Sequence, residues 1–261
     1  MYSILVDVTK CTGCEKCVVA CTAANNLNPE KSDYDRVAAK DGLSANRLLS
    51  LIEVENDKFA RKSCMHCVEP SCVSACLVGG ITKSADGPVI YDPDKCIGCR
   101  YCMLSCPFHI PRYEWDKQAP YIKKCNMCFE KLEAGGHPAC VGACPNGALE
   151  FGERSELLSK AKSLIAADRS KYFNHVWGEK EFGGTSVLYV SDVGLDKLGW
   201  PEYDAKSIPE VTDPLIEKTP VIGLSVASSL MGISWIINRR QKIAKENKKS
   251  DKNTRPESEE E

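Results

Sequence analysis

The 261-residue sequence lacks the patterns of several common activities. Its formal net charge of −2 gives no reason to expect nucleic acid as a partner. The four His are scattered, and no set of Ser, His and Asp suggests a hydrolytic triad. No glycine-rich nucleotide loop follows a predicted strand, because Gly79–Gly80 and Gly135–Gly136 are typical of ordinary turns. No catalytic residue is therefore assigned.

Two further absences concern targeting and cysteine. Residues 1–8 alternate like a strand and show no charged region, apolar stretch or cleavage site, so no signal peptide is expected. Cysteine is absent from the last 117 residues, although the chain contains sixteen. All sixteen lie between Cys11 and Cys144 in four groups of four. Because a disulfide framework would scatter its cysteines, disulfides are not expected.

The spacing within the groups predicts iron–sulfur clusters. The third group, which ends in Cys106–Pro107, reads C-x2-C-x2-C-x3-C-P. That run is typical of bacterial two-cluster ferredoxins, in which the fourth Cys binds the neighbouring cluster. The four groups are Cys11, Cys14, Cys17, Cys21; Cys64, Cys67, Cys72, Cys76; Cys96, Cys99, Cys102, Cys106; and Cys125, Cys128, Cys140, Cys144.

Zinc is the other metal that thiolates select. Structural zinc takes four ligands, usually as two separated pairs, whereas the first and third groups each place four Cys within eleven residues. Zinc is conceivable for the second and fourth groups taken alone. Eight Cys in each half of this region match two clusters completely, so the spacing favours clusters over zinc.

An internal repeat relates the groups. Residues 6–14 echo residues 91–99, and residues 70–76 echo residues 138–144. We therefore expect an α+β fold of duplicated two-cluster ferredoxin domains with insertions. Short strands are expected near residues 88–91 and 148–151, beside the cysteine groups.

The segments between and after the groups are read from their periodicity. A polar insertion covers Asn25 to Asp41, and residues 47–54 are expected to form a strand. Residues 155–168 predict an amphipathic helix with Ser155 as its N-cap, and residues 186–190 predict a strand. An extended connection punctuated by Pro201, Pro209, Pro214 and Pro220 is expected next. The expected domains are 1–154 with four clusters, 155–218 with the helix, a partner-contact segment and the linker, a membrane helix at 219–238, and a charged, disordered tail at 239–261.

Residues 219–238 form an uncharged run of twenty that is long enough to cross a bilayer. A buried helix of a soluble domain is the alternative, but the run lies between a Pro-rich connection and a charged tail, which favours a membrane span. Basic residues from Arg239 to Lys249 follow the run, and the preceding linker is net acidic. The positive-inside rule then places the tail in the cytoplasm and the cysteine domain on the periplasmic face of the inner membrane. Without a signal peptide, that orientation implies export bound to a partner with a twin-arginine signal; the reverse orientation is the other possibility.

The four groups and the apolar tail resemble the iron–sulfur (beta) subunit of membrane-bound oxidoreductases related to dimethyl sulfoxide reductase. Among these, the chain is most similar to the beta subunit of respiratory formate dehydrogenase and to the iron–sulfur subunit of uptake nickel–iron hydrogenase. The likeness covers nearly the whole chain, including Gly183 to Tyr189. Thr22 and Leu77 depart from the pattern, because proline follows the last Cys of the other two groups.

The resemblance implies four [4Fe–4S] clusters whose ligands are exchanged between groups. The implied sets are Cys11, Cys14, Cys17 with Cys144; Cys125, Cys128, Cys140 with Cys21; Cys64, Cys67, Cys72 with Cys106; and Cys96, Cys99, Cys102 with Cys76. Lys10, Lys95, Lys123 and Lys124 precede ligands and would favour the reduced clusters, although solubilising lysines are an equal alternative. For His66 and His109, exposed positions are favoured over hydrogen bonds to clusters.

The leading hypothesis is a non-catalytic electron-transfer subunit of anaerobic respiration. It would connect a catalytic subunit, of the formate dehydrogenase (molybdenum or tungsten) or nickel–iron hydrogenase type, to an integral membrane quinone-reactive or cytochrome b-type subunit. Reductases of sulfur or nitrogen compounds are alternative donors or acceptors. A different class, a zinc-binding, membrane-tethered assembly protein, is the second hypothesis.

Overall fold

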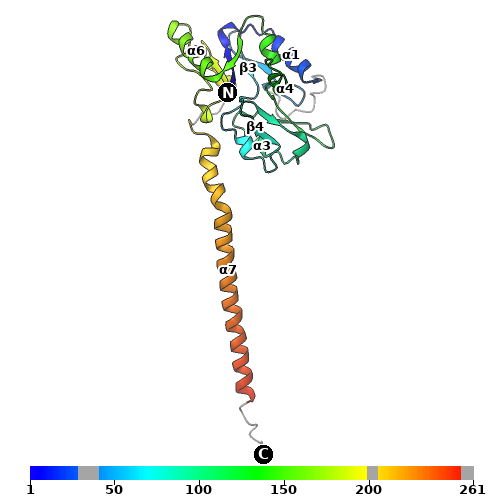
Figure 1. Cartoon of the computed structure of the whole chain (residues 1–261), viewed down its shortest axis with the longest axis vertical. Helices are drawn as coiled ribbons and strands as arrows, with labels where there is room; N and C mark the ends of the chain where they lie inside the picture. The colour runs from blue at the N-terminus through cyan, green and yellow to red at the C-terminus, as the bar shows by residue number, and fades with distance from the viewer. Residues whose placement is uncertain (29–40, 199–204, 254–261) are drawn as a thin grey trace, which may run out of the picture. The chain divides into compact units, whose positions relative to one another are not determined.

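The computed structural model describes residues 1–28, 41–198 and 205–253 (Figure 1). The chain divides into two compact units, Met1–Val211 and Thr212–Glu261, which we describe separately. Pro201, most of the polar insertion and the last eight residues of the tail lie outside the described residues.

A three-stranded sheet, in the order β8-β1-β9, organises the first unit. Strand β1 (Tyr2–Asp7) pairs antiparallel with β8 (Leu149–Glu153) and parallel with β9 (Val187–Val190). The expected strands at residues 1–8, 148–151 and 186–190 are thus present. Strands β8 and β9 come much later in the chain than β1. Their pairing with β1 therefore brings the N-terminal strand beside segments that follow the last cysteine group.

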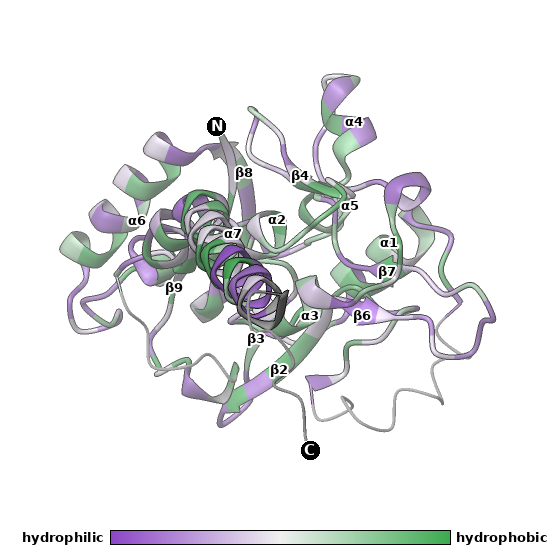
Figure 2. Cartoon of the chain, turned by 90° about the horizontal axis from the view of Figure 1, so that it is seen from below, coloured by the Kyte–Doolittle hydropathy of each residue, from purple (hydrophilic) through white to green (hydrophobic). Residues whose placement is uncertain are grey.

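Helix α6 (Arg154–Ala167) covers one face of this sheet. Its buried Leu157, Ala161 and Ile165 pack with Leu5 and Leu188 of the strands. Figure 2 shows that α6 carries both hydrophobic and hydrophilic residues, as an amphipathic helix does. The helix begins at Arg154 with Glu153 as its N-cap, so the predicted Ser155 cap is wrong by two positions. The opposite face of the sheet, which includes Ile4 and Val6, packs into the larger core that contains many of the cysteines.

Three hairpins complete the strand structure. They are β2 (Ser50–Glu55) with β3 (Lys58–Lys62), β4 (Ile81–Lys83) with β5 (Val89–Tyr91), and β6 (Arg112–Tyr113) with β7 (Ile122–Lys123). The predicted strands at 47–54 and 88–91 correspond to β2 and β5. Short 3-10 helices lie at Val8–Lys10 (η1), Pro93–Lys95 (η4), Glu181–Gly183 (η5) and Asp196–Leu198 (η6).

Short α-helices follow or carry the cysteines. They are α1 (Lys16–Ala24), α2 (Ser71–Ser74), α3 (Tyr101–Ser105), α4 (Phe129–Glu133) and α5 (Ala139–Gly142). Helix α1 packs on α5, and α2 packs on α3. The first cysteine group is thereby brought to the fourth, and the second group to the third.

Helix α7 (Ile208–Asn253) contains the apolar run and is much longer than expected. It begins at Ile208 because the Ser207 hydroxyl accepts a hydrogen bond from Glu210 N at 3.1 Å, as an N-cap does. Pro209 is in the first turn, where proline is tolerated, and Pro214 and Pro220 lie inside the helix. The predicted extended connection is therefore wrong from residue 208 onward, and the tail is helical to Asn253.

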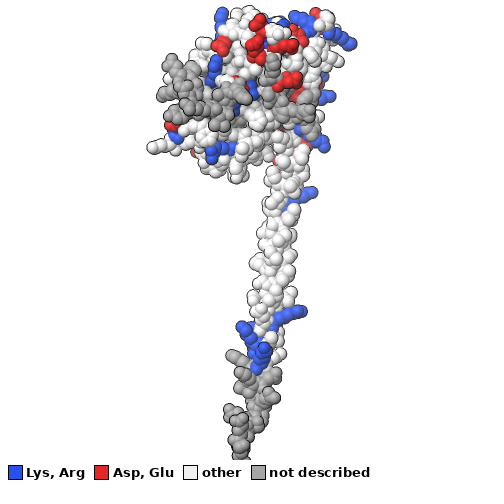
Figure 3. Space-filling model, turned by 180° about the vertical axis from the view of Figure 1, so that it is seen from behind, with Lys and Arg blue, Asp and Glu red and all other residues white. Residues whose placement is uncertain are grey.

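The described residues include one helix, 208–248, that is long and apolar enough to be a candidate membrane span. Its side chains from Val211 to Ile243 include many exposed large hydrophobics. Figure 3 shows a stretch of α7 without charged residues, followed toward the C-terminus by Lys and Arg.

Candidate cluster-binding sites

The first cysteines of groups one and three lie on similar turns. Before each turn, an Asp side chain accepts a hydrogen bond from the backbone N two residues on, at 3.1 Å for Asp7 and 3.0 Å for Asp92. After it, α1 and α3 each follow an N-cap residue with a left-handed backbone, Glu15 (φ 56°) or Arg100 (φ 64°). The same local geometry thus presents two three-cysteine loops.

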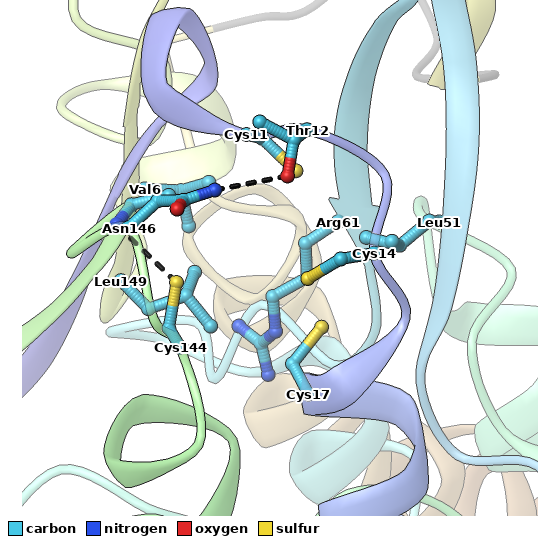
Figure 4. Close-up of a pocket in the computed structure, with 11 residues that line it drawn as sticks. Val6, Cys11, Thr12, Cys14, Cys17, Leu51, Arg61, Cys144, Asn146 and Leu149 are labelled. Carbon is cyan, nitrogen blue, oxygen red and sulfur yellow. Dashed lines mark hydrogen bonds between the residues drawn. The ribbon is translucent and has the colours of Figure 1, made fainter.

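One pocket brings three cysteines of group one together with the last cysteine of group four. Cys11, Cys14, Cys17 and Cys144 line about 410 Å³ of space that is partly open to solvent. Figure 4 shows their sulfurs around a common space with the guanidinium of Arg61 among them. Cys144 Sγ accepts a hydrogen bond from Ala148 N at 3.3 Å, which orients this sulfur.

A second pocket joins group three to group two in the same manner. Cys96, Cys99, Cys102 and Cys76 line about 320 Å³ of space together with apolar side chains such as Ile81 and Ile122. Two sulfurs accept backbone hydrogen bonds, Cys76 Sγ from Gly80 N at 3.2 Å and Cys96 Sγ from Gly98 N at 3.4 Å. Amide hydrogen bonds to sulfur are one of the means by which proteins set the potential of a cluster.

The other eight cysteines fall into two further neighbourhoods. Burial raises the pKa of Cys21, and the charges of Cys125, Cys140 and Cys128 raise it further. Burial likewise raises the pKa of Cys67 well above its usual range, with added contributions from Cys106, Cys64 and Cys72. Each implied ligand set therefore consists of thiols that lie near one another.

Buried thiols in these sets resist ionisation. Burial raises the pKa of Cys17 to about 11 and that of Cys125 to about 12, while the positive charge of Arg61 opposes both shifts. Thiolates crowded in this way need a cationic partner, and a bound metal deprotonates its ligand thiols. These thiols would therefore lose their protons on binding a metal.

The described cysteines form no ready-made site for a single metal ion. Among the described residues, no group of three or more His, Cys, Asp or Glu side chains has the geometry to hold one ion. Four thiolates around tetrahedral zinc, with Zn–S bonds near 2.3 Å, would lie only about 3.8 Å apart. A set of four cysteines can instead supply one thiolate to each iron of a [4Fe–4S] cube.

Unpaired buried donors also fit such a group. Within the described part of the chain, all three guanidinium nitrogens of Arg61, Ser63 Oγ and His66 Nε2 are buried without a hydrogen-bond partner. His66 Nδ1 accepts a hydrogen bond from Val89 N at 2.9 Å, which leaves the ring proton on Nε2. Buried polar groups are normally paired, and cluster sulfides and cysteine sulfurs are acceptors. The donors present therefore fit iron–sulfur clusters held by the neighbouring cysteines.

The four lysines that precede cluster ligands in the sequence differ in burial. Lys10, Lys95 and Lys123 are partly exposed and lie in ion pairs with Asp7, Asp92 and Glu114. Lys124 is buried, and its ammonium donates to the carbonyls of Val89 and Cys125.

The two histidines also differ. His109 is exposed, as expected, but His66 is only 1 % exposed, so the prediction of an exposed side chain is wrong there. Burial lowers the pKa of His66 well below its usual value, and the charges of Lys124 and Lys83 lower it further. Sequence reasoning missed Arg61 altogether, because only the pairing of β3 with β2 reveals that its side chain points into the core.

Comparison with known proteins also indicates iron–sulfur clusters. The family described as a 4Fe-4S dicluster domain matches residues 56–154. A protein of Nitratidesulfovibrio vulgaris is 38 % identical over 256 residues, which cover 94 % of this chain and 69 % of the relative. The hydrogenase-2 operon protein HybA of Escherichia coli is 33 % identical over 278 residues, covering 92 % of this chain and 84 % of the relative. The iron–sulfur subunit of the nitrate-inducible formate dehydrogenase of Escherichia coli is 36 % identical over 197 residues, covering 71 % and 66 %.

Proposed function

Because the chain belongs to the family of iron–sulfur subunits that includes HybA and the formate dehydrogenase subunits, we propose that it carries electrons through four [4Fe–4S] clusters. It would connect a catalytic subunit of the formate dehydrogenase or nickel–iron hydrogenase type to a quinone-reactive membrane subunit. A bound cluster supplies reversible one-electron transfer. The observation that carries the proposal is the gathering of sixteen thiols into sets of four.

The proposed ligand sets exchange the fourth cysteine between groups. The two four-cysteine pockets support the sets completed by Cys144 and by Cys76. The mutual influence of thiols supports the sets completed by Cys21 and by Cys106. The full sets are Cys11, Cys14, Cys17, Cys144; Cys96, Cys99, Cys102, Cys76; Cys125, Cys128, Cys140, Cys21; and Cys64, Cys67, Cys72, Cys106.

A duplicated ferredoxin-like domain accounts for this exchange. Two observations support two related halves. Similar turns precede Cys11 and Cys96, and α1 packs on α5 just as α2 packs on α3. In the two pockets, three cysteines of one half meet a cysteine from the other half of the duplication.

The membrane part of the proposal rests on α7. We propose that residues 219–238 span the membrane, with Arg239 and the following basic residues in the cytoplasm and the cysteine domain on the periplasmic side. The candidate span at 208–248 supports the anchor. The orientation is supported by the charge difference between the two flanks alone.

The test is an anaerobic reductive titration of the complex isolated by a tag on this chain, followed by electron paramagnetic resonance. Four clusters should take up about four electrons per chain and give four distinguishable reduced centres. A chain that takes up no electrons and contains zinc would contradict the proposal, because zinc has no redox chemistry. Mass spectrometry of the co-isolated subunits identifies the catalytic partner.

A further inference from the structure

Arg61 is a buried cation that forms no ion pair with any residue in the part of the chain that the structure describes. Its side chain is 2 % exposed and is among the largest fully buried side chains of the chain. Its backbone carbonyl accepts a hydrogen bond from the Tyr189 hydroxyl at 2.8 Å, which fixes this part of β3. None of its three guanidinium nitrogens has a hydrogen-bond partner among the described residues. A guanidinium desolvated in this manner is costly unless an anion accompanies it.

The groups around the guanidinium identify that anion. Arg61 lines the pocket of Cys11, Cys14, Cys17 and Cys144 (Figure 4). Its charge also acts on the thiols of Cys21, Cys125 and Cys140, which belong to a different proposed ligand set. Arg61 is thus near two of the four sets at once.

An arginine guanidinium does not lose its proton in a folded protein, so the charge of Arg61 is fixed and its effect does not depend on titration. It behaves as a fixed charge with donors directed at sulfur.

We propose that Arg61 sets the potentials of the two clusters held by Cys11, Cys14, Cys17, Cys144 and by Cys125, Cys128, Cys140, Cys21. This inference rests on the proposed function. Reduction adds one electron to a cluster and makes it more negative by one unit. A fixed positive charge in a water-poor interior stabilises the reduced form more than the oxidised form, so it raises the midpoint potential.

Arg61 is a positioning residue for electron flow, because it holds no iron itself. A single cation beside two sets raises both of their potentials, which shifts this pair relative to the remaining two clusters.

The test compares midpoint potentials in variants of the full complex. Arg61→Met removes the charge at similar volume, and Arg61→Lys keeps the charge. Arg154→Met is the matched control, because the Arg154 guanidinium is partly buried, donates to the carbonyls of Thr185, Gly178 and Glu179, and is not coupled to any cysteine. The two clusters of interest are identified by the resonance signals that disappear in Cys144→Ser and in Cys21→Ser.

Potentials are measured by dithionite titration with electron paramagnetic resonance, and iron per chain is measured in every variant. In Arg61→Met, we expect the potentials of these two clusters to fall and those of the other two to stay. Arg61→Lys should restore most of the change, and Arg154→Met should leave all four potentials unaltered. Iron loss confined to these two clusters in Arg61→Met would count against the proposal, because Arg61 would then hold the clusters rather than set their potentials.

Four unchanged potentials at full iron content in Arg61→Met would overturn the inference. So would loss of all clusters together with the fold, judged by circular dichroism, because Arg61 would then serve folding only. An unaltered chain without clusters would instead contradict the proposed function itself, so the two failures are distinguishable.

Discussion

At the residue scale, each proposed ligand set takes its fourth cysteine from a distant part of the chain. Cys144 lies in the pocket of Cys11, Cys14 and Cys17, although 133 positions separate it from Cys11. The cysteine spacing predicted that cysteines bind the clusters and that there are four cluster sites. The partners within each set came from resemblance, and the structure supports them through the packing of α1 on α5 and of α2 on α3.

Cys11→Ser and Cys144→Ser should therefore remove or alter the same resonance signal, whereas Cys140→Ser should alter a different one. Each variant should lose up to about four iron atoms per chain, or about one if a three-iron cluster survives. Signals are recorded on the reduced complex, with unsubstituted protein prepared in parallel as the reference. If Cys144→Ser and Cys140→Ser affected one signal and Cys11→Ser another, the exchanged ligation would be wrong.

Residues that act from the core were less accessible to sequence reasoning than the ligands. Cysteine spacing is a local property, so it is visible in the chain. The burial of Arg61 and His66 depends on which strands pair and on which side each side chain lies. A basic residue and a histidine beside cysteines have the same sequence pattern whether they face water or the core, and only the tertiary fold decides between them.

At the scale of elements, a buried ionic contact links the loop before β2 to the β6–β7 hairpin. Asp41 Oδ2 is 2.7 Å from an Arg112 guanidinium nitrogen and 3.2 Å from Lys62 Nζ. Burial raises the pKa of Asp41, but the charge of Arg112, the Leu43 N–H and Lys62 outweigh it, so the pKa lies below its ordinary value. The carboxylate is therefore stabilised in the folded state.

Asp41→Asn should lower the free energy of unfolding at pH 7 by roughly 1 to 3 kcal/mol, because it leaves two buried cations without their carboxylate. The pKa is lowered on folding, so this contribution is fully present above the unfolded pKa and is lost as the pH falls through the folded pKa. The difference from the unsubstituted chain should thus shrink below about pH 4. Urea unfolding at several pH values measures it.

Glu150→Gln is the matched control for this prediction. Glu150 pairs with Lys160 on the surface, where both side chains are well exposed, so its loss should change the free energy of unfolding by less than about 1 kcal/mol. Equal effects of the two substitutions at pH 7, or a difference for Asp41→Asn that does not vary with pH, would show that the Asp41 contact contributes little.

Elements with a strong local pattern were predictable, and those that depend on context were not. Strands β1, β5, β8 and β9 agree with the prediction from sequence, because each coincides with a short apolar segment rich in residues that favour strands. Helix α7 extends through Pro214 and Pro220 against the expectation, because a proline removes one N–H donor and the remaining hydrogen bonds of a long helix continue past it. The start of α6 shifts because Glu153 rather than Ser155 takes the cap position.

At the scale of the whole molecule, we propose an electron-transfer domain joined to a membrane anchor, for which α7 is the candidate span. The positive charges at Arg239 and Arg240 and beyond, at one end of the apolar run, predict a cytoplasmic C-terminus. A single cysteine introduced near the C-terminus, as Ser258→Cys, should be protected from a membrane-impermeant maleimide in spheroplasts and react after lysis. Labelling in intact spheroplasts would show that the proposed orientation is wrong. A known periplasmic protein with an accessible cysteine, in the same sample, controls for access of the reagent.

The number of clusters is the central claim, and metal analysis tests it most directly. The complex is isolated anaerobically, and its iron, zinc and acid-labile sulfide are measured per mole of this chain, after subtraction of the metals of its partners. Four [4Fe–4S] clusters require about 16 iron and about 16 sulfide, with no stoichiometric zinc. About 4 iron per chain, or zinc in place of iron in a folded protein, would contradict the account.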